Sequence, residues 1–334
     1  MGIQDRPYAW FRNDFLDKTS TSKIKYWKTG KYNMPQGESI ISKEGEGFKD
    51  WDSTAYNMIV ARETKRFIRI HKQKKKPNDP FFAYVALGGV HIPHSPPRQY
   101  TDGSPVAGEY PTPHMDVLGE MDKVVGSLVK YLKRRGLLQN TIVIFTSDNG
   151  GLGAKAGSEA VAGHASNGPL RGHKGLVYEG GQRVPLMMQW KGHIPRGETR
   201  SHMVGLNDLF STFSDFAGVQ VPTGQAIDSV SFADYIFDGS NTNGLRKYLA
   251  NWRISGSRLR SQTIRKKNMK LIQFYQENNK MELYDLDTDL SESSNIIASA
   301  NTTFLDEMLT ELNSKSPCGD GESSPDPVCR RDVF

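Results

Sequence analysis

Two short apolar segments, separated by an amphipathic one, constrain the fold of this chain most strongly. Residues 81–87 (FFAYVAL) and 141–146 (TIVIFT) are short, mostly apolar or β-branched, and bounded by turn residues, which is typical of buried strands. Apolar side chains recur between them every three or four positions, at Leu118, Met121, Val125, Leu128 and Leu132. This spacing predicts a helix that ends at Gly136. The strand–helix–strand order predicts an α/β fold, a mixed and mostly parallel sheet sandwiched by helices.

The segments before this unit predict less regular structure and one more helix. Residues 1–50 mix aromatic, glycine, lysine and serine residues without a sustained period, so we expect extended or loop structure there. From Ser53 the pattern becomes helical, and this second helix is expected to end at a lysine run and Pro77. Its apolar stripe is Tyr56, Ile59, Val60, Phe67 and Ile70.

The segments after this unit predict a further strand at 184–190 and a helix at 206–217, and the composition then changes. Beyond about residue 240 the elements become shorter and more polar, among them 269–275 and 281–286, which predicts a small C-terminal antiparallel subdomain. The expected organisation is an α/β domain over 1–240 that lacks its N-terminal part, a C-terminal subdomain over 241–315 and a disordered tail over 316–334.

Composition excludes several classes of protein. With 37% hydrophobic and 24% charged residues the chain is neither disordered nor fibrous, and its apolar runs are shorter than the roughly 20 residues that span a bilayer. The net charge of +6 comes largely from runs at 72–76 and 265–270, which we interpret as solvated faces. These runs have no aromatic interleaving, so no nucleic-acid partner is expected.

Signals of cellular location are weak in this sequence. The opening residues MGIQDRPYAWFRNDF lack the basic and apolar regions of a secretory signal peptide. Cys318 and Cys329 permit one local disulfide or two free thiols, and Asn301-Thr302-Thr303 is a glycosylation sequon.

Two polar motifs follow apolar segments, where open α/β sheets bind their ligands, and a third lies in the glycine-rich loop beyond them. Asp148 and Asn149, in TSDNGG, place hard oxygen donors that suit Ca²⁺ or Mg²⁺ at a strand end, although the same residues also form turns. His91 and His94, in VHIPHSPP, lie on a proline-stiffened loop and could bind an anion or protonate a leaving oxygen. The segment 168–185 surrounds a lysine with glycines and predicts an anion-binding loop.

Other catalytic motifs are missing from the sequence. It has no GxSxG elbow, no cysteine near these three motifs and no GxGxxG after a strand, which argues against serine hydrolases, thiol enzymes and dinucleotide enzymes.

The motifs together, in this order, resemble the sulfatases of the alkaline-phosphatase superfamily. The similar segments are PFFAYVALGGVHIPHSPP, MDKVVGSLVKYLKRRGLLQNTIVIFTSDNGG, GPLRGHKGLVYEGGQRVP and ELYDLDTDLSESSNI, from about residue 50 to 297. The resemblance implies that the chain is a type I, arylsulfatase-like sulfuric ester hydrolase with the alkaline-phosphatase-like fold.

The resemblance also implies roles for individual residues. Asp148 and Asn149 would bind the divalent cation, usually Ca²⁺, while His91 and Lys174 would contact the sulfate and act in catalysis. His94 and His173 would be further substrate contacts. We interpret three other motif residues as structural because they bracket glycine turns: Arg171, Glu179 and Arg183.

The sequence departs from the family in one respect that bears on activity. Family members carry an aspartate pair and a C-x-P-S-R or S-x-P-S-R motif whose first residue becomes a formylglycine nucleophile, and neither occurs here. The lysine–histidine pair of the family's GKWHLG-like segment is also missing. We therefore expect these features in a missing N-terminal segment, with sulfatase activity in the complete protein and little activity in this polypeptide alone.

Two alternatives remain at this point. The chain could be a phosphodiesterase or phosphonate hydrolase of the same superfamily, or an inactive sulfatase-like protein that binds sulfated glycans. The expected partner is a sulfated small molecule or glycan, and the resemblance implies a secreted, lysosomal or other secretory location. The sequence leaves the natural substrate and the oligomeric state open.

Overall fold

The computed structural model describes most of the chain. It covers strand residues 11–12, 15–16, 24–27, 30–33, 39–42 and 45–48, and segments 51–73, 79–92, 94–153, 163–255, 258–275 and 279–315. The cysteine pairing and the disordered tail predicted for 316–334 lie outside these residues. The chain forms two compact units, Met1–Gln139 with Ala154–His164, and Asn140–Gly153 with Ala165–Phe334, and each is described by itself. The domain boundary expected near residue 240 stays a prediction.

The start of the first unit consists of short antiparallel strand pairs, as expected for an extended segment. The pairs are β1 (Phe11–Arg12) with β2 (Phe15–Leu16), β3 (Ile24–Trp27) with β6 (Gly45–Phe48), and β4 (Gly30–Asn33) with β5 (Ser39–Ser42).

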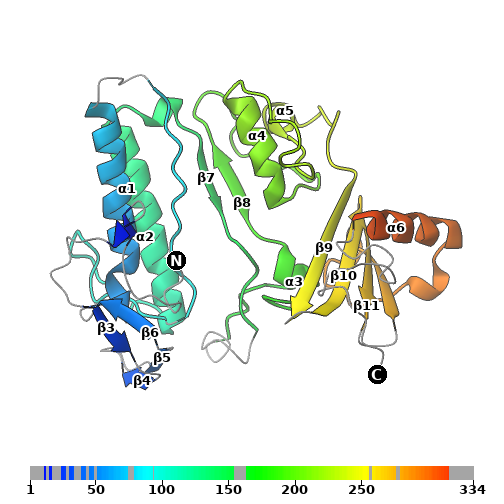
Figure 1. Ribbon diagram of the computed structural model, residues 1–334, viewed down its shortest axis with the longest axis horizontal. Coiled ribbons are helices and arrows are strands. Elements are labelled where there is room, and N and C mark those ends of the chain that lie inside the picture. The colour runs from blue at the N-terminus through cyan, green and yellow to red at the C-terminus, as the bar shows by residue number, and fades with distance from the viewer. Residues whose placement is uncertain are drawn as a thin grey trace. The chain divides into compact units, whose positions relative to one another are not determined.

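Two long helices that lie side by side form the rest of the first unit's regular structure (Figure 1). They are α1 (Tyr56–Gln73), which follows the 3₁₀ turn η1 (Ser53–Ala55), and α2 (Pro113–Arg134). Helix α2 begins with Pro113 in its first turn, and the Thr112 hydroxyl caps it by accepting from Met115 N at 3.3 Å. It ends before Gly136, whose φ of 68° provides the left-handed residue of the C-terminal turn.

Both helices were predicted, and Tyr56 and Leu132 of the predicted apolar stripes are buried, but other stripe residues were placed one residue off. Val117 and Val124 are 3% and 0% exposed, whereas the predicted Leu118 is 46% exposed. In α1, Ala61 and Ile68 are buried and the predicted Phe67 is 45% exposed. Adjacent apolar residues cause this error, because periodicity does not tell which one of such a pair faces the core.

The buried strand predicted at 81–87 does not form. These residues pair with no strand in the described part of the chain, and Phe82 and Tyr84 are 67% and 82% exposed. Leu87 N instead donates to Val85 O at 3.1 Å, which is a tight local turn. An apolar run acquires strand structure only when its N–H and C=O groups find a partner strand.

The second unit opens with a strand pair and small helices. Strand β7 (Val143–Thr146) pairs antiparallel with β8 (Leu186–Gln189), so the parallel pairing expected for these segments is not present among the described strands. The helical elements are α3 (Glu179–Gln182), η4 (Leu206–Asp208), α4 (Leu209–Phe216) and α5 (Ala233–Phe237), besides η2 (Leu138–Asn140) at the boundary of the units. The strand and helix predicted at 184–190 and 206–217 are thereby confirmed.

The C-terminal subdomain is an antiparallel sheet, as predicted. Its strand order is β12 (Lys280–Asp285), β11 (Met269–Phe274), β10 (Arg258–Lys266) and β9 (Tyr248–Ser255). The turn η5 (Ile297–Ser299) and helix α6 (Thr302–Lys315) follow, and α6 packs on the sheet (Figure 1). The shared core consists of Ile264, Leu271, Leu283, Met308 and Leu312.

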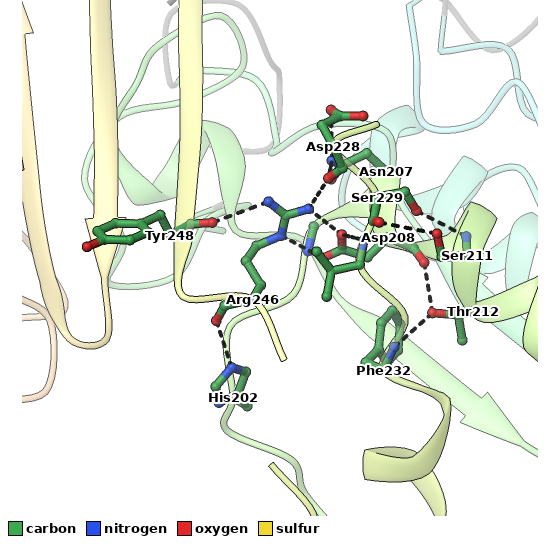
Figure 2. A network of polar contacts seen from close by, with 12 residues as sticks. His202, Asn207, Asp208, Ser211, Thr212, Asp228, Ser229, Phe232, Arg246 and Tyr248 are labelled. Atoms are coloured by element: carbon green, nitrogen blue, oxygen red, sulfur yellow. Dashed lines mark hydrogen bonds and ion pairs between the residues drawn. The ribbon is translucent and has the colours of Figure 1, made fainter. Parts of the chain in front are cut away.

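An ion-pair network joins this sheet to the α4 region (Figure 2). Arg246 donates from Nε to Asp208 Oδ2 at 2.9 Å, and its Nη2 contacts both Asp208 Oδ1 and the main-chain oxygen of Asp228. The Asp208 carboxylate, 1% exposed, also accepts from Gly205 N at 2.8 Å and Val230 N at 2.9 Å. One buried carboxylate therefore fixes the start of α4, the loop after it and the entry to β9.

No helix in the described part of the chain is long and apolar enough to cross a membrane.

Candidate active site

Two of the predicted motifs, far apart in the sequence, are bonded together inside the second unit. Gly150 N donates to Gly181 O at 3.0 Å, and Lys174 N donates to Gly151 O at 2.8 Å. The side chain of Asn167 adds a third link, because its Oδ1 accepts from Gly151 N at 2.7 Å while its Nδ2 donates to Gly172 O at 3.2 Å. The turn that the sequence predicted to bind a cation and the lysine loop are thus one local structure.

Glycine is required where these two segments meet. A Cβ on Gly150 would lie 1.9 Å from Gly180 O, and a Cβ on Gly180 would lie 2.4 Å from Gly172 O. The glycines at these positions therefore allow the backbone to pack against itself, a function different from the anion contact that the sequence predicted for the loop glycines.

Gly150→Ala is expected to destabilise the second unit by about 1–3 kcal/mol, because one segment must move to make room for the methyl group. Thermal unfolding by circular dichroism measures the effect. The control is Gly126→Ala in α2, where a Cβ meets nothing within 4 Å. That substitution should raise stability by about 0.5–1 kcal/mol, since alanine is the better helix former. Equal melting temperatures for Gly150→Ala and wild type would show that the two segments are not closely packed.

Asp148 and Asn149 present oxygen donors directly after β7. The Asp148 side chain is exposed, and Asn149 Nδ2 donates to Gly150 O at 3.0 Å. A carbonyl only accepts, so the amide nitrogen must face it, and Asn149 Oδ1 remains as the donor atom for a cation. Two adjacent hard oxygens fit part of a Ca²⁺ shell, which takes 6–8 oxygen ligands. The described residues contain no group of three or more His, Cys, Asp or Glu side chains arranged for a metal.

Lys174 and His173 lie on the loop that is bonded to this turn. Both are half-buried, and no ion pair joins Lys174 to a carboxylate among the described residues. His173 Nδ1 lies 2.9 Å from Lys174 O, which makes Nδ1 the protonated nitrogen. Its ring packs against Gly153, where a Cβ would lie 2.7 Å from His173 Cδ2. This packing gives His173 a structural contact, and its predicted substrate contact stays a prediction.

The two predicted histidines of the first unit have different surroundings. His91 is exposed, and its Nδ1 lies 2.6 Å from Ile92 O, so Nδ1–H donates and Nε2 remains available to a ligand. His94 is only 2% exposed, and its Nε2 lies 3.3 Å from Nδ1 of the buried His114. This burial gives His94 a packing contact with His114, and its predicted substrate contact stays a prediction.

A buried ion-pair network, which sequence analysis missed, holds the far end of the lysine loop. Lys270 Nζ lies 2.9 Å from Glu179 Oε1 and 2.8 Å from Glu292 Oε1, while Arg183 Nε lies 2.7 Å from Glu179 Oε2. Lys270 is 1% exposed, which corrects the interpretation of 265–270 as a solvated face. The basic run alternates along β10 and β11, so one member of the run can point inward.

Burial and charge act in opposite directions on the two glutamates of this network. Burial raises the pKa of Glu179, but the charges of Lys270 and Arg183 outweigh it and the net pKa is lowered. For Glu292, burial exceeds the effect of Lys270 and the pKa is raised. Glu292 Oε2 also accepts from Glu179 N at 2.6 Å. The carboxylates of both glutamates contact the Lys270 ammonium.

Arg171 secures the near end of the same loop. Its Nη1 donates to Tyr284 OH at 2.9 Å and to Glu292 O at 2.8 Å, and its guanidinium stacks 4.0 Å from the Tyr178 ring. These contacts agree with the structural roles that sequence analysis gave to Arg171, Glu179 and Arg183.

A large open cavity of about 1730 Å³ lies within the second unit. Asp148 is the sequence-predicted site residue that lines it, and charged and aromatic side chains share its wall, among them Arg183, Trp190, Arg246, Trp252 and Arg265.

Comparison with known families explains why these motifs occur together. A family model described as Sulfatase matches residues 8–219, and a second, described as N-sulphoglucosamine sulphohydrolase, C-terminal, matches residues 172–316. The chain belongs to the sulfatase family. Its relatives include N-acetylgalactosamine-6-sulfatase of Mus musculus, which is 32% identical over 54% of this chain and 32% of that protein. The sulfatase chain thus spans about a third of the length of this curated relative.

Solved structures support the fold assignment. A Bacteroides thetaiotaomicron sulfatase from a study of glycosaminoglycan metabolism has a TM-score of 0.75 and 23% identity, covering 94% of this chain and 70% of that one. A second structure, solved with its substrate D-glucosamine-2-N,6-O-disulfate, has a TM-score of 0.51 and 26% identity, covering 63% of this chain and 41% of that one. The alkaline-phosphatase-like fold class is confirmed, with the antiparallel C-terminal sheet in its predicted place.

Proposed function

We propose that the protein hydrolyses a sulfate ester to an alcohol and sulfate, with a divalent cation and the residues of the two bonded motifs. The observation that supports this most is the bonded turn and loop, which keep Asp148, Asn149 and Lys174 in one rigid local structure. Family membership supplies the reaction type, and the local geometry supplies charged groups that suit it.

Each residue has a chemical role in this proposal. Asp148 and Asn149 Oδ1 hold Ca²⁺, or Mg²⁺, whose charge neutralises the sulfate oxygens when the cation is bound. The Lys174 ammonium adds a second positive charge to the same group. His91, whose Nδ1–H donates to Ile92 O, contacts the sulfate through Nε2, and in its doubly protonated form it gives the Nε2 proton to the departing alcohol.

We propose a sulfated glycan as the substrate. The related structure solved with a disulfated glucosamine shows that a family member binds such a sugar. The cavity lined by Asp148 exceeds the about 300–1,000 Å³ typical of pockets for small ligands, and its arginines and tryptophans suit charged and planar sugar faces.

Calcium and ligand binding test the proposal without requiring turnover. The 334 residues contain no C-x-P-S-R or S-x-P-S-R motif, so we expect little hydrolysis by this polypeptide alone. Titration calorimetry with Ca²⁺, and then with D-glucosamine-2-N,6-O-disulfate in Ca²⁺ or in chelator, gives the two affinities.

Asp148→Ala is expected to weaken Ca²⁺ binding by at least about 10–100-fold, the loss usual for disturbing a metal site. Because the side chain is exposed, the melting temperature should change little. The control is Asp215→Ala, an exposed carboxylate of α4, which should leave Ca²⁺ binding unchanged. Lys174→Met should keep Ca²⁺ binding and weaken the sugar about 10–100-fold, as for a lost charged hydrogen bond. Calcium affinity that is equal in Asp148→Ala and wild type would refute the cation site.

The alternatives predict other outcomes. A phosphodiesterase or phosphonate hydrolase, in a preparation that turns over, would prefer an aryl phosphodiester to an aryl sulfate under the same conditions. A sulfatase-like binding protein would bind the disulfated sugar and hydrolyse neither ester, even in a preparation that carries the family's nucleophile.

We also propose a secretory location for the protein, on the basis of its sequon. Asn301, directly before α6, and Thr303, in its first turn, are both exposed, and Asn301 Oδ1 accepts from Phe304 N at 3.1 Å, which leaves Nδ2 outside that bond. Protein isolated from its natural source should lose mass on treatment with peptide-N-glycosidase, and Asn301→Gln should abolish that loss. A mass unaffected by the enzyme would argue against a glycosylated, secretory form.

A further inference from the structure

A buried glutamate between the two long helices is unexplained by the proposed chemistry. Glu120 of α2 is 1% exposed, and its Oε2 accepts from Asn57 Nδ2 of α1 at 3.0 Å. Its other oxygen, Oε1, is equally enclosed and has no hydrogen-bond partner among the described residues. A buried carboxyl with one unpaired oxygen is costly to keep, so a function for it is worth seeking.

Asn57 connects this carboxyl to the turn that carries His91. Its Oδ1 accepts from Gly88 N at 2.9 Å, and His91 N donates to Gly88 O at 3.0 Å. Asn57 is 4% exposed, so both ends of its planar amide are engaged inside the protein. A chain of three hydrogen bonds therefore runs from Glu120 to the backbone of His91.

The charge of Glu120 can change under physiological conditions. Burial raises its pKa to about 7, and the hydrogen bond from Asn57 offsets only part of this effect. Because the folded chain keeps a proton that the unfolded chain has lost, ionisation costs stability as pH rises from the ordinary glutamate value through about 7. Other titratable and charged side chains on the surrounding elements include Tyr56, Arg62, Glu63 and Lys65 of α1, His114, Asp116, Asp122 and Lys123 of α2, and His91 and His94 of the loop.

Ionisation of Glu120 would change the strength of the hydrogen bond from Gly88 N to Asn57. A carboxylate accepts a stronger hydrogen bond than a neutral carboxyl does, which polarises the Asn57 amide and makes its Oδ1 a better acceptor for Gly88 N–H.

We propose that Glu120 is a positioning residue which, through Asn57, couples its own ionisation to the turn that carries His91. The coupling is a property of the first unit alone, and its consequence for catalysis rests on the proposed function of His91. Above the transition the turn is held by a charge-assisted network, and below it by a neutral one.

Nuclear magnetic resonance of the 334-residue chain tests the coupling without substrate. The amide shifts of Gly88 and His91 and the side-chain carboxyl carbon of Glu120 are followed from pH 5 to pH 9. In the wild type, the Glu120 carboxyl and the Gly88 amide should titrate together, with a midpoint near pH 7.

Glu120→Gln keeps the shape and the acceptor of a neutral carboxyl but cannot ionise. The titration of the Gly88 amide that matches Glu120 should disappear in this variant, and any pH dependence that remains comes from another group. Glu109→Gln, at an exposed glutamate of the same unit, is the control and should retain the wild-type curve.

An identical Gly88 curve in Glu120→Gln and wild type would overturn the proposal, as would a Glu120 carboxyl that ionises without moving Gly88. Both results are independent of calcium and sugar binding, so failure of the proposed function would be recognised separately.

Discussion

Lys270→Met is expected to lower the free energy of unfolding by about 3–5 kcal/mol, the loss typical of breaking a buried ion pair from one side. The substitution leaves Glu179 and Glu292, 5% and 0% exposed, without the ammonium that lies 2.9 and 2.8 Å from them. Urea denaturation followed by circular dichroism measures the loss.

The pH dependence of the stability lost in Lys270→Met identifies the cause of that loss. Burial already raises the folded-state pKa of Glu292, and loss of Lys270 raises it further, so the variant gains relative stability as pH falls and Glu292 becomes protonated. The deficit should therefore be smaller at pH 5 than at pH 8. Lys280→Met is the control, because Lys280 is 51% exposed in its pair with Glu282 and should contribute about 0–1 kcal/mol. A Lys270→Met variant as stable as this control would show that Lys270 is not buried between two carboxylates.

Asp208→Ala is expected to have an effect of similar size, again about 3–5 kcal/mol, because it leaves Arg246 without its carboxylate partner. It also removes the acceptor of Gly205 N and Val230 N (Figure 2). The thermal unfolding midpoint should fall by several degrees or more, since about 1 kcal/mol shifts the midpoint of a 150–250-residue domain by about 2–4 °C.

The same network contains its own control. Asp228 is exposed, and Arg246 contacts its main-chain oxygen, so Asp228→Ala keeps that contact and removes only the bond from Asn207 Nδ2 at 3.0 Å. We expect a change within about 0.5 kcal/mol for this surface substitution. Equal losses for Asp208→Ala and Asp228→Ala would contradict the central position of Asp208.

Helices and strands could be predicted where the sequence pattern that specifies them lies within their own residues. The helix before Gly136 carries a regular apolar spacing within its own residues, and it ends where expected. Residues 81–87 carry an equally clear apolar run, yet a strand also needs a partner from elsewhere, and none is present in the described part of the chain.

The candidate site likewise contains residues that the sequence identified and differences that only the tertiary structure shows. Asp148, Asn149 and Lys174 were found because residue type and order identify the sulfatase family, and the structure bonds their two segments together. The roles assigned to them stay predictions until metal and sugar binding are measured. The difference between His91 and His94 was not predictable, because both belong to one loop and only packing against His114 separates them.

The sequence by itself determined the family, the positions of its motifs and the helices α1, α2 and α4, because these depend on residue types at short spacing. Tertiary structure alone decided which polar groups are buried: Lys270 in a basic run, Glu120 on a mixed helix face, and Asp208 at a helix start. It also decided that Gly150 is needed for the approach of Gly180 O. Burial and close approach depend on neighbours contributed by segments far away in the chain, and no local pattern contains that information.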